Sequence, residues 1–527
     1  MKNTITRLAI ASLLILTSDL ASAGSATWNL SPTTNDWNTA INWTPMTIPN
    51  GTGDTATFGV SNTTAVSISA PTTVASIVFN PGASAYTIAT SDDLFTVSGA
   101  GIVNNSGVLQ TIDSTLGPIY FQNASVVGDM ISIVGDASFM NNAQAGSVTI
   151  VSSDSIGFSG TSSAQNANLA MLPESFAAAR ISFSDTSTAD HATITLHPEP
   201  PGAFGIPAIL FDSHSSAGNA TLIAEGAISD DTSSPQIDIE GHSDAANATF
   251  IAYGGSNGGN GGDIIFTGTP SGGTARIELF GNSALDITLT HGVQIGSVEG
   301  ESEATIELGA SQLQVGTNNL GTGFAGTIED HGQGGSLVKV GTGVFTLTGM
   351  SDYKGVTTIK AGTLIVANTS GSATGTGAVS VNAGTFGGNG MITGAVTVGT
   401  GSGAGAILAP AAGSSVQTTL TTHGLVTLLA DSTYQCTAKA KGRKARTDEI
   451  AANGVNISGA KFSFRPKILG ALQAGTVFTV ISNTSASPIS GTFSNLADGA
   501  IITAGGVNFQ ANYEGGDGND LTLTVVP

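Results

Sequence analysis

The stretch ISFSDTSTADHATITL, residues 181–196, determines the fold because the chain repeats its pattern. It joins a short apolar strand, a turn of small polar residues and a second alternating strand. Weaker copies begin at Ala137 and Ile156. Three clear copies follow, with first residues spaced 28, 28 and 27 residues apart: ILFDSHSSAGNATLIA (209–224), IDIEGHSDAANATFIA (237–252) and IIFTGTPSGGTARIEL (264–279).

Repeats of this length with short strands are typical of a solenoid, in which each coil stacks on the previous one. Equivalent strands then pair in parallel about 4.8 Å apart. The inward positions, Phe183, Phe211, Ile239 and Phe266, form an apolar column. The sequence predicts an all-β fold, a right-handed parallel β-helix. If most of the chain after residue 23 joined it, roughly 20 coils would give a rod on the order of 100 Å long.

The composition agrees with an all-β protein. Glycine contributes 71 of the 527 residues and charged residues 10%, and long runs of helix-forming Leu, Glu, Lys and Gln are missing. The mean hydropathy of +0.21 argues against disorder. Cys436 is the one cysteine, so no intrachain disulfide can form.

The charge of the chain excludes one class of partner. The formal net charge is −22, and between Gly24 and Val338 the basic residues are Arg180 and Arg276. A surface this acidic repels nucleic acid, anionic lipid and acidic polysaccharide. We therefore expect no nucleic-acid partner.

The first 23 residues have the pattern of a Sec-type signal peptide. Lys2 and Arg7 precede an apolar core, and Ala21-Ser22-Ala23 offers a cleavage site before Gly24. The apolar core is too short for a membrane anchor, and no later segment is apolar for long enough to span a bilayer. We expect a secreted or cell-surface protein.

The three tryptophans, Trp28, Trp37 and Trp43, lie together near the start of the exported chain. Exposed aromatic rings could bind sugar faces. The alternative that we favour is an N-terminal aromatic cap, which covers the open strand edges of the first coil.

Two stretches interrupt the repeat. Residues 171–180 could form a short helix, and the prolines of 197–208 predict a loop. Either stretch could be a functional loop that projects from the coils. We favour the interpretation that each is a surface loop whose length can vary without affecting the fold.

From Ser336 the chain reads SLVKVGTGVFTLTGMSDYKGVTTIKAGTLIV, which resembles the autotransporter-associated β-strand repeat (PATR) of large exported passenger proteins. Ser351 stands where the family usually has Asn, in a turn. The positions that carry the resemblance are Lys339, Gly341, Gly343, Phe345, Leu347, Gly349, Tyr353, Gly355, Thr357, Ile359, Gly362, Thr363 and Leu364.

The resemblance implies a β-helical fold and an exported, surface-associated role, and it implies no enzyme activity. A transporter barrel would require long amphipathic strands up to the C-terminus. The repeat-like section instead continues to Pro527, so we expect a passenger-like protein without a C-terminal transporter barrel.

We expect five regions along the chain. A signal peptide (1–23) precedes a tryptophan-containing cap (24–59), and the β-helix with 27–28-residue repeats covers 60–335. The PATR region spans 336–410, and a Gly-rich C-terminal β section follows at 411–527.

Polysaccharide enzymes on β-helices use clustered carboxylates. The adjacent pairs Asp92–Asp93 and Asp230–Asp231 would point to opposite faces of a strand, and the two arginines of the acidic section lie 96 residues apart. We therefore predict no catalytic residues.

His191, His214 and His242 recur near the repeat turns, at the eleventh, sixth and sixth positions of their units. His214 and His242 are thus the two histidines in register. Two stacked imidazoles on adjacent coils would make a weak zinc site, and we favour the interpretation that both lie in solvated turns. We predict no metal-ligating and no cofactor-binding residues.

The run KAKGRKAR (439–446) holds five of the 15 basic residues and predicts an exposed loop between strands. It could instead be a protease-sensitive site, or a contact for an acidic partner such as the acidic rod of another copy.

Two segments, GGNGGDIIF (258–266) and GGDGNDLTL (515–523), fit a calcium-binding β-roll nonapeptide. Such rolls need tandem copies, and these two lie 257 residues apart. The second segment therefore predicts a tight turn with unusual backbone angles at Gly515 and Gly518, followed by the closing strand LTLTVV.

The sequence predicts an exported structural or adhesive rod that makes multivalent contacts along a repetitive face. Its partners would be glycans, extracellular matrix or another surface protein. The alternative is a polysaccharide-acting enzyme or carbohydrate-binding module on the same scaffold.

Overall fold

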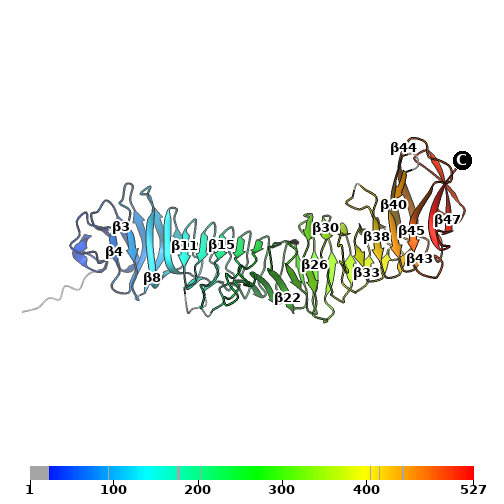
Figure 1. The fold of residues 1–527 in the computed structure, drawn as a ribbon. Coiled ribbons are helices and arrows are strands. Elements are labelled where there is room, and N and C mark those ends of the chain that lie inside the picture. Colours follow the sequence, from blue (N-terminus) through cyan, green and yellow to red (C-terminus); the bar gives the residue numbers. More distant parts are fainter. Residues whose placement is uncertain are drawn as a thin grey trace, which may run out of the picture.

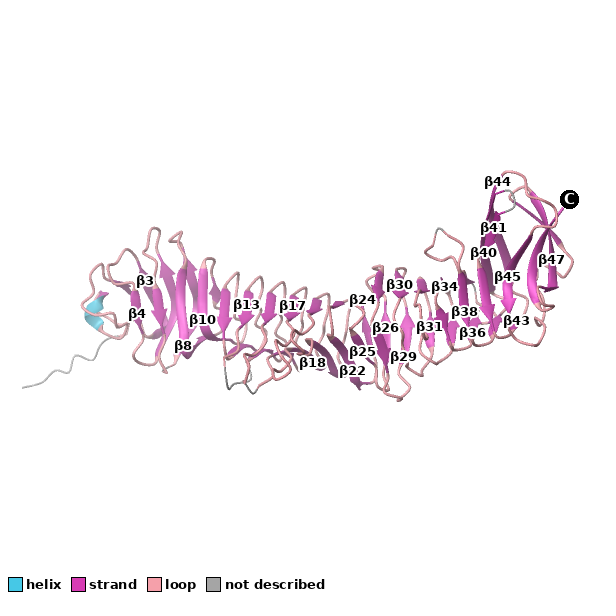
Figure 2. Cartoon of the chain, in the orientation of Figure 1, coloured by secondary structure: helices cyan, strands magenta, loops and turns pink. Residues whose placement is uncertain are grey.

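The chain folds into a long rod of stacked coils with a raised C-terminal end (Figure 1). This computed structural model describes residues 23–92, 94–174, 179–202, 205–403, 405–414, 416–441 and 444–527. Within them the helical content is one short 3-10 helix, η1 (Ala40–Asn42), and strands dominate every other part (Figure 2).

Strands follow one another along the rod in chain order. The N-terminal strands are β1 (Ala26–Trp28), β2 (Trp43–Thr44), β3 (Gly51–Phe58), β4 (Ala65–Ser67), β5 (Thr72–Phe79), β6 (Thr87–Ala89), β7 (Phe95–Asn104), β8 (Gln110–Phe121) and β9 (Val126–Val127). The repeat coils contain β10 (Ile131–Phe139), β11 (Thr149–Ser152), β12 (Ser155–Phe158), β13 (Asn168–Met171), β14 (Arg180–Phe183), β15 (Thr193–Leu196), β16 (Ala208–Phe211), β17 (Thr221–Ala224), β18 (Gln236–Gly241), β19 (Thr249–Ala252), β20 (Asp263–Gly268) and β21 (Arg276–Leu279).

The second half of the rod has shorter strands. They are β22 (Ala284–Thr290), β23 (Val293–Ile295), β24 (Ser297–Gly300), β25 (Thr305–Glu307), β26 (Gln312–Val315), β27 (Thr322–Phe324), β28 (Thr327–Glu329), β29 (Ser336–Lys339), β30 (Val344–Leu347), β31 (Thr357–Ile359), β32 (Thr363–Val366), β33 (Val379–Val381), β34 (Gly384–Gly388), β35 (Met391–Ile392), β36 (Val396–Val398) and β37 (Ala406–Leu408). The C-terminal strands are β38 (Thr419–Thr422), β39 (Val426–Leu428), β40 (Ser432–Lys441), β41 (Lys444–Thr447), β42 (Glu449–Ala452), β43 (Val455–Ile457), β44 (Lys461–Leu469), β45 (Val477–Asn483), β46 (Ile501–Ala504), β47 (Val507–Gly515) and β48 (Asp520–Val526).

The described residues form a parallel β-solenoid of about 17 turns, as the repeat predicts. At about 4.8 Å per coil the solenoid is about 80 Å long. The expectation of roughly 20 coils was too high, because residues at both ends of the chain form structures that close the solenoid and do not form coils. The strands belong, within the described part, to sheets of 33, 8 and 7 strands.

The predicted apolar column is present. Phe158, Phe183, Phe211, Ile239 and Phe266 occupy equivalent positions on successive paired strands. The rings of Phe183 and Phe211 are 4.7 Å apart with an interplanar angle of 5°. Since every one of these side chains is at most 1% exposed, the column forms the core of the rod.

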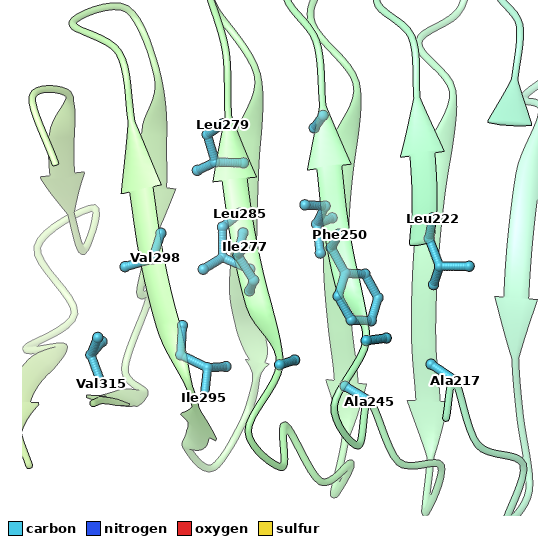
Figure 3. Packing of buried hydrophobic residues seen from close by; sticks show 14 of the residues in the cluster. Ala217, Leu222, Ala245, Phe250, Ile277, Leu279, Leu285, Ile295, Val298 and Val315 are labelled. Carbon is cyan, nitrogen blue, oxygen red and sulfur yellow. The ribbon is translucent and has the colours of Figure 1, made fainter. Parts of the chain in front are cut away.

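The second strand of each coil supplies the other half of the core. Leu222, Phe250, Ile277 and Val298 are paired from coil to coil, and Figure 3 shows them side by side on successive strands. The corners are closed by small buried residues, such as Ala217 and Ala245.

The prediction of a short helix at 171–180 is wrong for the residues of this stretch that the structure describes. Met171 ends β13, residues 172–174 have no regular structure and Arg180 begins β14, while residues 175–178 lie outside the described residues. The stretch 197–208 lies between β15 and β16 and is a loop in its described part, as its prolines predict.

The tryptophans form the N-terminal cap. The ring centroids of Trp28 and Trp43, and those of Trp37 and Trp43, are 5.0 Å apart in edge-to-face geometry. The indole nitrogen of Trp37 donates to the carbonyl oxygen of Pro49 (2.9 Å). All three rings are at most 2% exposed, which excludes them as a sugar-binding platform.

The C-terminal end changes from parallel to antiparallel pairing. Parallel β38, β42 and β45 continue into antiparallel β48, β47 and β46, which close the rod. The segment GGDGNDLTL forms the β47–β48 hairpin, with Gly515 opposite Asp520. Positive φ angles occur at Gly516 (62°) and Gly518 (112°), so the expectation for Gly515 was wrong by one residue.

The described residues of the basic run 439–446 do not form a loop. Lys439 to Lys441 continue β40, and Lys444 to Arg446 belong to the antiparallel strand β41. Gly442 and Arg443 between them lie outside the described residues. The interpretation as a loop was wrong because small alanines, at positions 438 and 440, supply the buried face of this strand.

We expect Phe183→Ala to lower the free energy of unfolding by about 3–5 kcal/mol, because it leaves a cavity between two stacked rings that cannot collapse. Denaturant unfolding followed by circular dichroism would measure the change, and amide hydrogen exchange should accelerate in β12, β14 and β16. The outward-facing Ser182→Ala is the matched control. A loss below about 1 kcal/mol for Phe183→Ala would contradict a close-packed column.

Candidate functional site

The turns that join the two strands of each repeat coil form one polar surface, which we call the turn face. Neighbouring turns are hydrogen-bonded in register; for example, His242 N–H donates to Ser213 O (3.1 Å) and Thr269 N–H to Gly241 O (3.0 Å). The side chains therefore repeat in columns with a spacing of about 4.8 Å.

Three columns make up the turn face. The first and third are exposed, and the second is largely half-buried. The first column is Asn142, Thr161, Thr186, His214, His242 and Thr269. The second is Gln144, Ser163, Thr188, Ser216, Asp244 and Ser271. The third is Ser147, Asn166, His191, Asn219, Asn247 and Thr274.

Side chains within the columns are linked from coil to coil. Asn247 Nδ2 donates to Asn219 Oδ1 (3.3 Å), and the Thr274 hydroxyl donates to Asn247 Oδ1 (2.5 Å). Hydroxyl and amide groups both donate and accept hydrogen bonds and carry no charge. The turn face thus offers a regular, mostly uncharged hydrogen-bonding surface.

The histidines lie on the turn face as their spacing predicts. The rings of His214 and His242 are 5.5 Å apart on adjacent coils. His191 lies in the third column, where its Nδ1 is 2.5 Å from Asp190 Oδ1. The structure therefore brings two of the three together.

A second polar feature, which we call the acid row, consists of Asp286, Glu307 and Glu329. These residues pair in register across β22, β25 and β28. His331 Nε2 lies 3.6 Å from Glu307 Oε2. Burial, with Glu307 and Asp286 adding to it, raises the pKa of nearby Asp263 to about 6.

Glu307, Glu329 and His331 are the described residues that could hold a metal ion, since one ligand atom from each lies within 4.8 Å of the others. Sequence reasoning missed this group. A signal was present in the tripeptide Thr-Ile-Glu, which occurs at 305–307 and again at 327–329, but it falls outside the 27–28-residue repeat.

The carboxylates considered for catalysis have ordinary surroundings. Asp230 and Asp231 lie in an exposed turn between β17 and β18, and Asp92 lies near the start of β7. Asp93 lies outside the described residues. Arg276 is held in ion pairs, with its Nε 3.0 Å from Glu278 Oε1 and its guanidinium also bonded to Glu299.

The PATR positions have structural roles within one coil. Phe345, Leu347 and Leu364 point into the core. Tyr353 is buried and shares a 2.5 Å hydrogen bond with the Thr357 hydroxyl. Thr363 begins β32 opposite Val344 of β30, and Ile359 ends β31 opposite Lys339.

The PATR glycines let adjacent coils approach each other. A Cβ on Gly341, whose φ is 65°, would lie 1.8 Å from the carbonyl oxygen of Gly316. No side chain fits at this distance. The same close approach to a neighbouring backbone applies to Gly343, Gly349, Gly355 and Gly362.

Lys339 is a buried lysine at the end of β29, 1% exposed. Its Nζ donates to the carbonyl oxygens of Val340 and Gly341, the latter at 3.3 Å. Burial lowers the pKa of Lys339 to about 8. The amine thus closes a turn of the repeat instead of facing solvent.

Other predicted features have simpler outcomes. The Cys436 thiol is buried, and burial raises its pKa, so it is a poor nucleophile.

The predicted signal peptide is not tested by the structure. Ala21 and the rest of residues 1–22 lie outside the described residues, which begin at Ala23 and Gly24. Among the residues that the structure describes, no helix has both the length and the apolar character that crossing a membrane requires.

Comparisons with known proteins agree with the resemblance. Residues 337–366 match the family model described as PATR, the passenger-associated-transport-repeat, so the repeat identified from Ser336 onward is confirmed. A stretch of 97 residues is 37% identical to the adhesin BmaC autotransporter of Brucella suis biovar 1 (strain 1330). It covers 18% of this chain and 3% of that protein, so the chain matches a small part of its curated relative.

The crystal structure of the Haemophilus influenzae Hap adhesin aligns with 90% of this chain and 63% of its own, at 10% sequence identity and a TM-score of 0.33.

We expect the buried amine of Lys339 to make stability depend on pH. The unfolded state, with a lysine pKa near 10.5, binds more protons than the folded state with its value of about 8. The stability that this group contributes is therefore greatest above the unfolded value and is lost as the pH falls toward 8.

Relative to Lys339→Met, the free energy of unfolding of the native chain should rise by about 2 kcal/mol between about pH 7.5 and pH 9.5. Urea unfolding at both pH values would measure this difference, with the exposed Lys360→Met as the control. Parallel pH profiles for the native chain and Lys339→Met would contradict the assignment.

Proposed function

We propose that the chain is an exported structural or adhesive protein, a rigid surface or extracellular rod that makes multivalent contacts through its turn face. The observation that supports this most directly is the repetition of the same outward polar positions on six successive coils, from Asn142 to Thr269. The function proposed is binding without chemistry.

Multivalency follows from the geometry of the columns. A typical hydrogen bond exchanged with water contributes about 0.5–1.5 kcal/mol, so one coil alone binds weakly. Contacts made together along a rigid scaffold add up without a new entropy cost for each contact. A repetitive partner, with polar groups spaced like the coils, would gain the most.

The partner class that fits the turn face is polar and carries little charge. Most of its side chains are hydroxyls and amides, whereas the net charge of the chain is −22. Neutral glycans, extracellular matrix and other surface proteins meet these requirements. The sequence relative in Brucella suis is named an adhesin, which supports this class of function.

Export would depend on the predicted signal peptide at 1–23, and the mature protein would be secreted or bound at the cell surface. Its cap (24–59) and C-terminal section (411–527) would protect the two ends. The coils of 60–335 and the PATR region of 336–410 would form the rod between them.

The test uses residues 24–527 on an array of neutral and acidic glycans, and on immobilised collagen and fibronectin. A triple variant with Asn166, Asn219 and Asn247 each replaced by Lys projects long side chains from the third column. We expect its apparent affinity for the bound partner to fall about tenfold or more, because several contacts are lost together.

The matched control replaces three exposed polar residues of later coils, Ser302, Gln333 and Thr348, by Lys and should bind within about twofold of the native chain. Equal binding by both triple variants would refute the turn face as the adhesive surface. Release of soluble sugar products from the glycans would refute a function without chemistry.

A further inference from the structure

Basic residues are concentrated at one end of this acidic chain. Eight of the 15 lysines and arginines fall between positions 439 and 467. Seven of these eight lie in described strands: two in β40, two in β41 and three in β44, while Arg443 lies outside the described residues. Strands β40 and β44 project from the raised C-terminal corner of the rod (Figure 1). Figure 2 shows β40, β41 and β44 extending beyond the line of the coils.

Three of these cations form a row across adjacent strands, which we call the cation row. Lys439 of β40 pairs with Arg446 of β41 on one side and with Lys467 of β44 on the other. Directly paired residues point to the same face of a sheet, and all three side chains are exposed. The row therefore presents three positive charges on one face.

More cations surround the row on the same face. Lys441 follows Lys439 by two residues, and Arg465 precedes Lys467 by two, so both point the same way and both are exposed. A pocket of about 290 Å³ adjoins the row, between Lys439, Lys441 and Arg446 and the apolar side chains of Val416 and Leu469. An acidic surface with aliphatic neighbours would fit here.

The acid row in the middle of the rod is the counterpart. Asp286, Glu307 and Glu329 are half-buried and lie on three paired strands, as the three cations do. Adjacent strands are about 4.8 Å apart, so both rows repeat their charge at nearly the same spacing. Like charges directly opposite each other destabilise a sheet. A ligand that supplied cations at this spacing would relieve that repulsion.

We propose that the cation row of one copy binds the acid row of a second copy. Lys439, Arg446 and Lys467 would then face the carboxylates of Asp286, Glu307 and Glu329 of that copy as three parallel ion pairs.

The net charge of −22 repels two copies at long range. At physiological ionic strength, however, the screening length is about 8 Å, so the long-range repulsion is weak. The opposite charges that come into contact then determine whether the two copies associate. The two rows are different surfaces of one chain, so the contact is heterologous. Such contacts leave a free row at each end of a dimer and allow further copies to add.

The test is sedimentation velocity of residues 24–527 at about 20 mM and about 500 mM NaCl, with EDTA present. We expect self-association at low salt and monomers at high salt. The double variants Lys439→Glu with Lys467→Glu, and Glu307→Lys with Glu329→Lys, should each weaken association about tenfold or more.

Mixing these two double variants should restore association, because each retains the row that the other has lost. The controls carry the same changes of net charge elsewhere: Arg180→Glu with Lys360→Glu, and Glu174→Lys with Glu514→Lys. They should associate like the native chain, and circular dichroism should show all variants folded.

Four results would overturn the proposal. The native chain could stay monomeric at low salt, or the charge reversals could leave its association unchanged. Association could occur only in a parallel run without EDTA, which would assign Glu307 and Glu329 to a bridging metal ion. A monomer that binds phosphatidylglycerol vesicles through Lys439 and Lys467 would assign the cation row to an anionic lipid.

Discussion

Parallel hydrogen bonding in register between neighbouring coils is the constraint on which the rest of the structure depends. Once Ile181 pairs with Ile209 and Phe183 with Phe211, every other residue of the coil is placed against its equivalent on the next coil. The side-chain period of two then separates a buried column from an outward one. Core, turn face and charge rows are three results of this one rule.

The same register that stabilises the inside constrains the outside. Stacked phenylalanines gain contact with each other, but stacked carboxylates repel, and backbone pairing in register holds them opposite each other. Asp286, Glu307 and Glu329 illustrate the difficulty, since each is fixed above its neighbour by backbone pairing. Polar uncharged residues can stack without this repulsion, which accounts for the Ser, Thr and Asn content of the turn face.

The sequence was informative where neighbouring coils repeat the same residue types. The column through Phe183 could be predicted because apolar periodicity leaves a direct pattern, and the PATR coil around Lys339 could be identified from its resemblance to a known repeat. The acid row could not, since its coils are 21 and 22 residues long and depart from the longer repeat. The strand character of 439–446 was missed because alanines form its inner face, and alanine is a weak apolar signal.

The two ends of the rod are closed by different devices, indole rings at one end and an antiparallel sheet at the other. Neither closure contacts the central coils, so a coil gained or lost between them changes neither end. Related chains can therefore differ in reach in steps of about 4.8 Å while keeping the same tip and the same base.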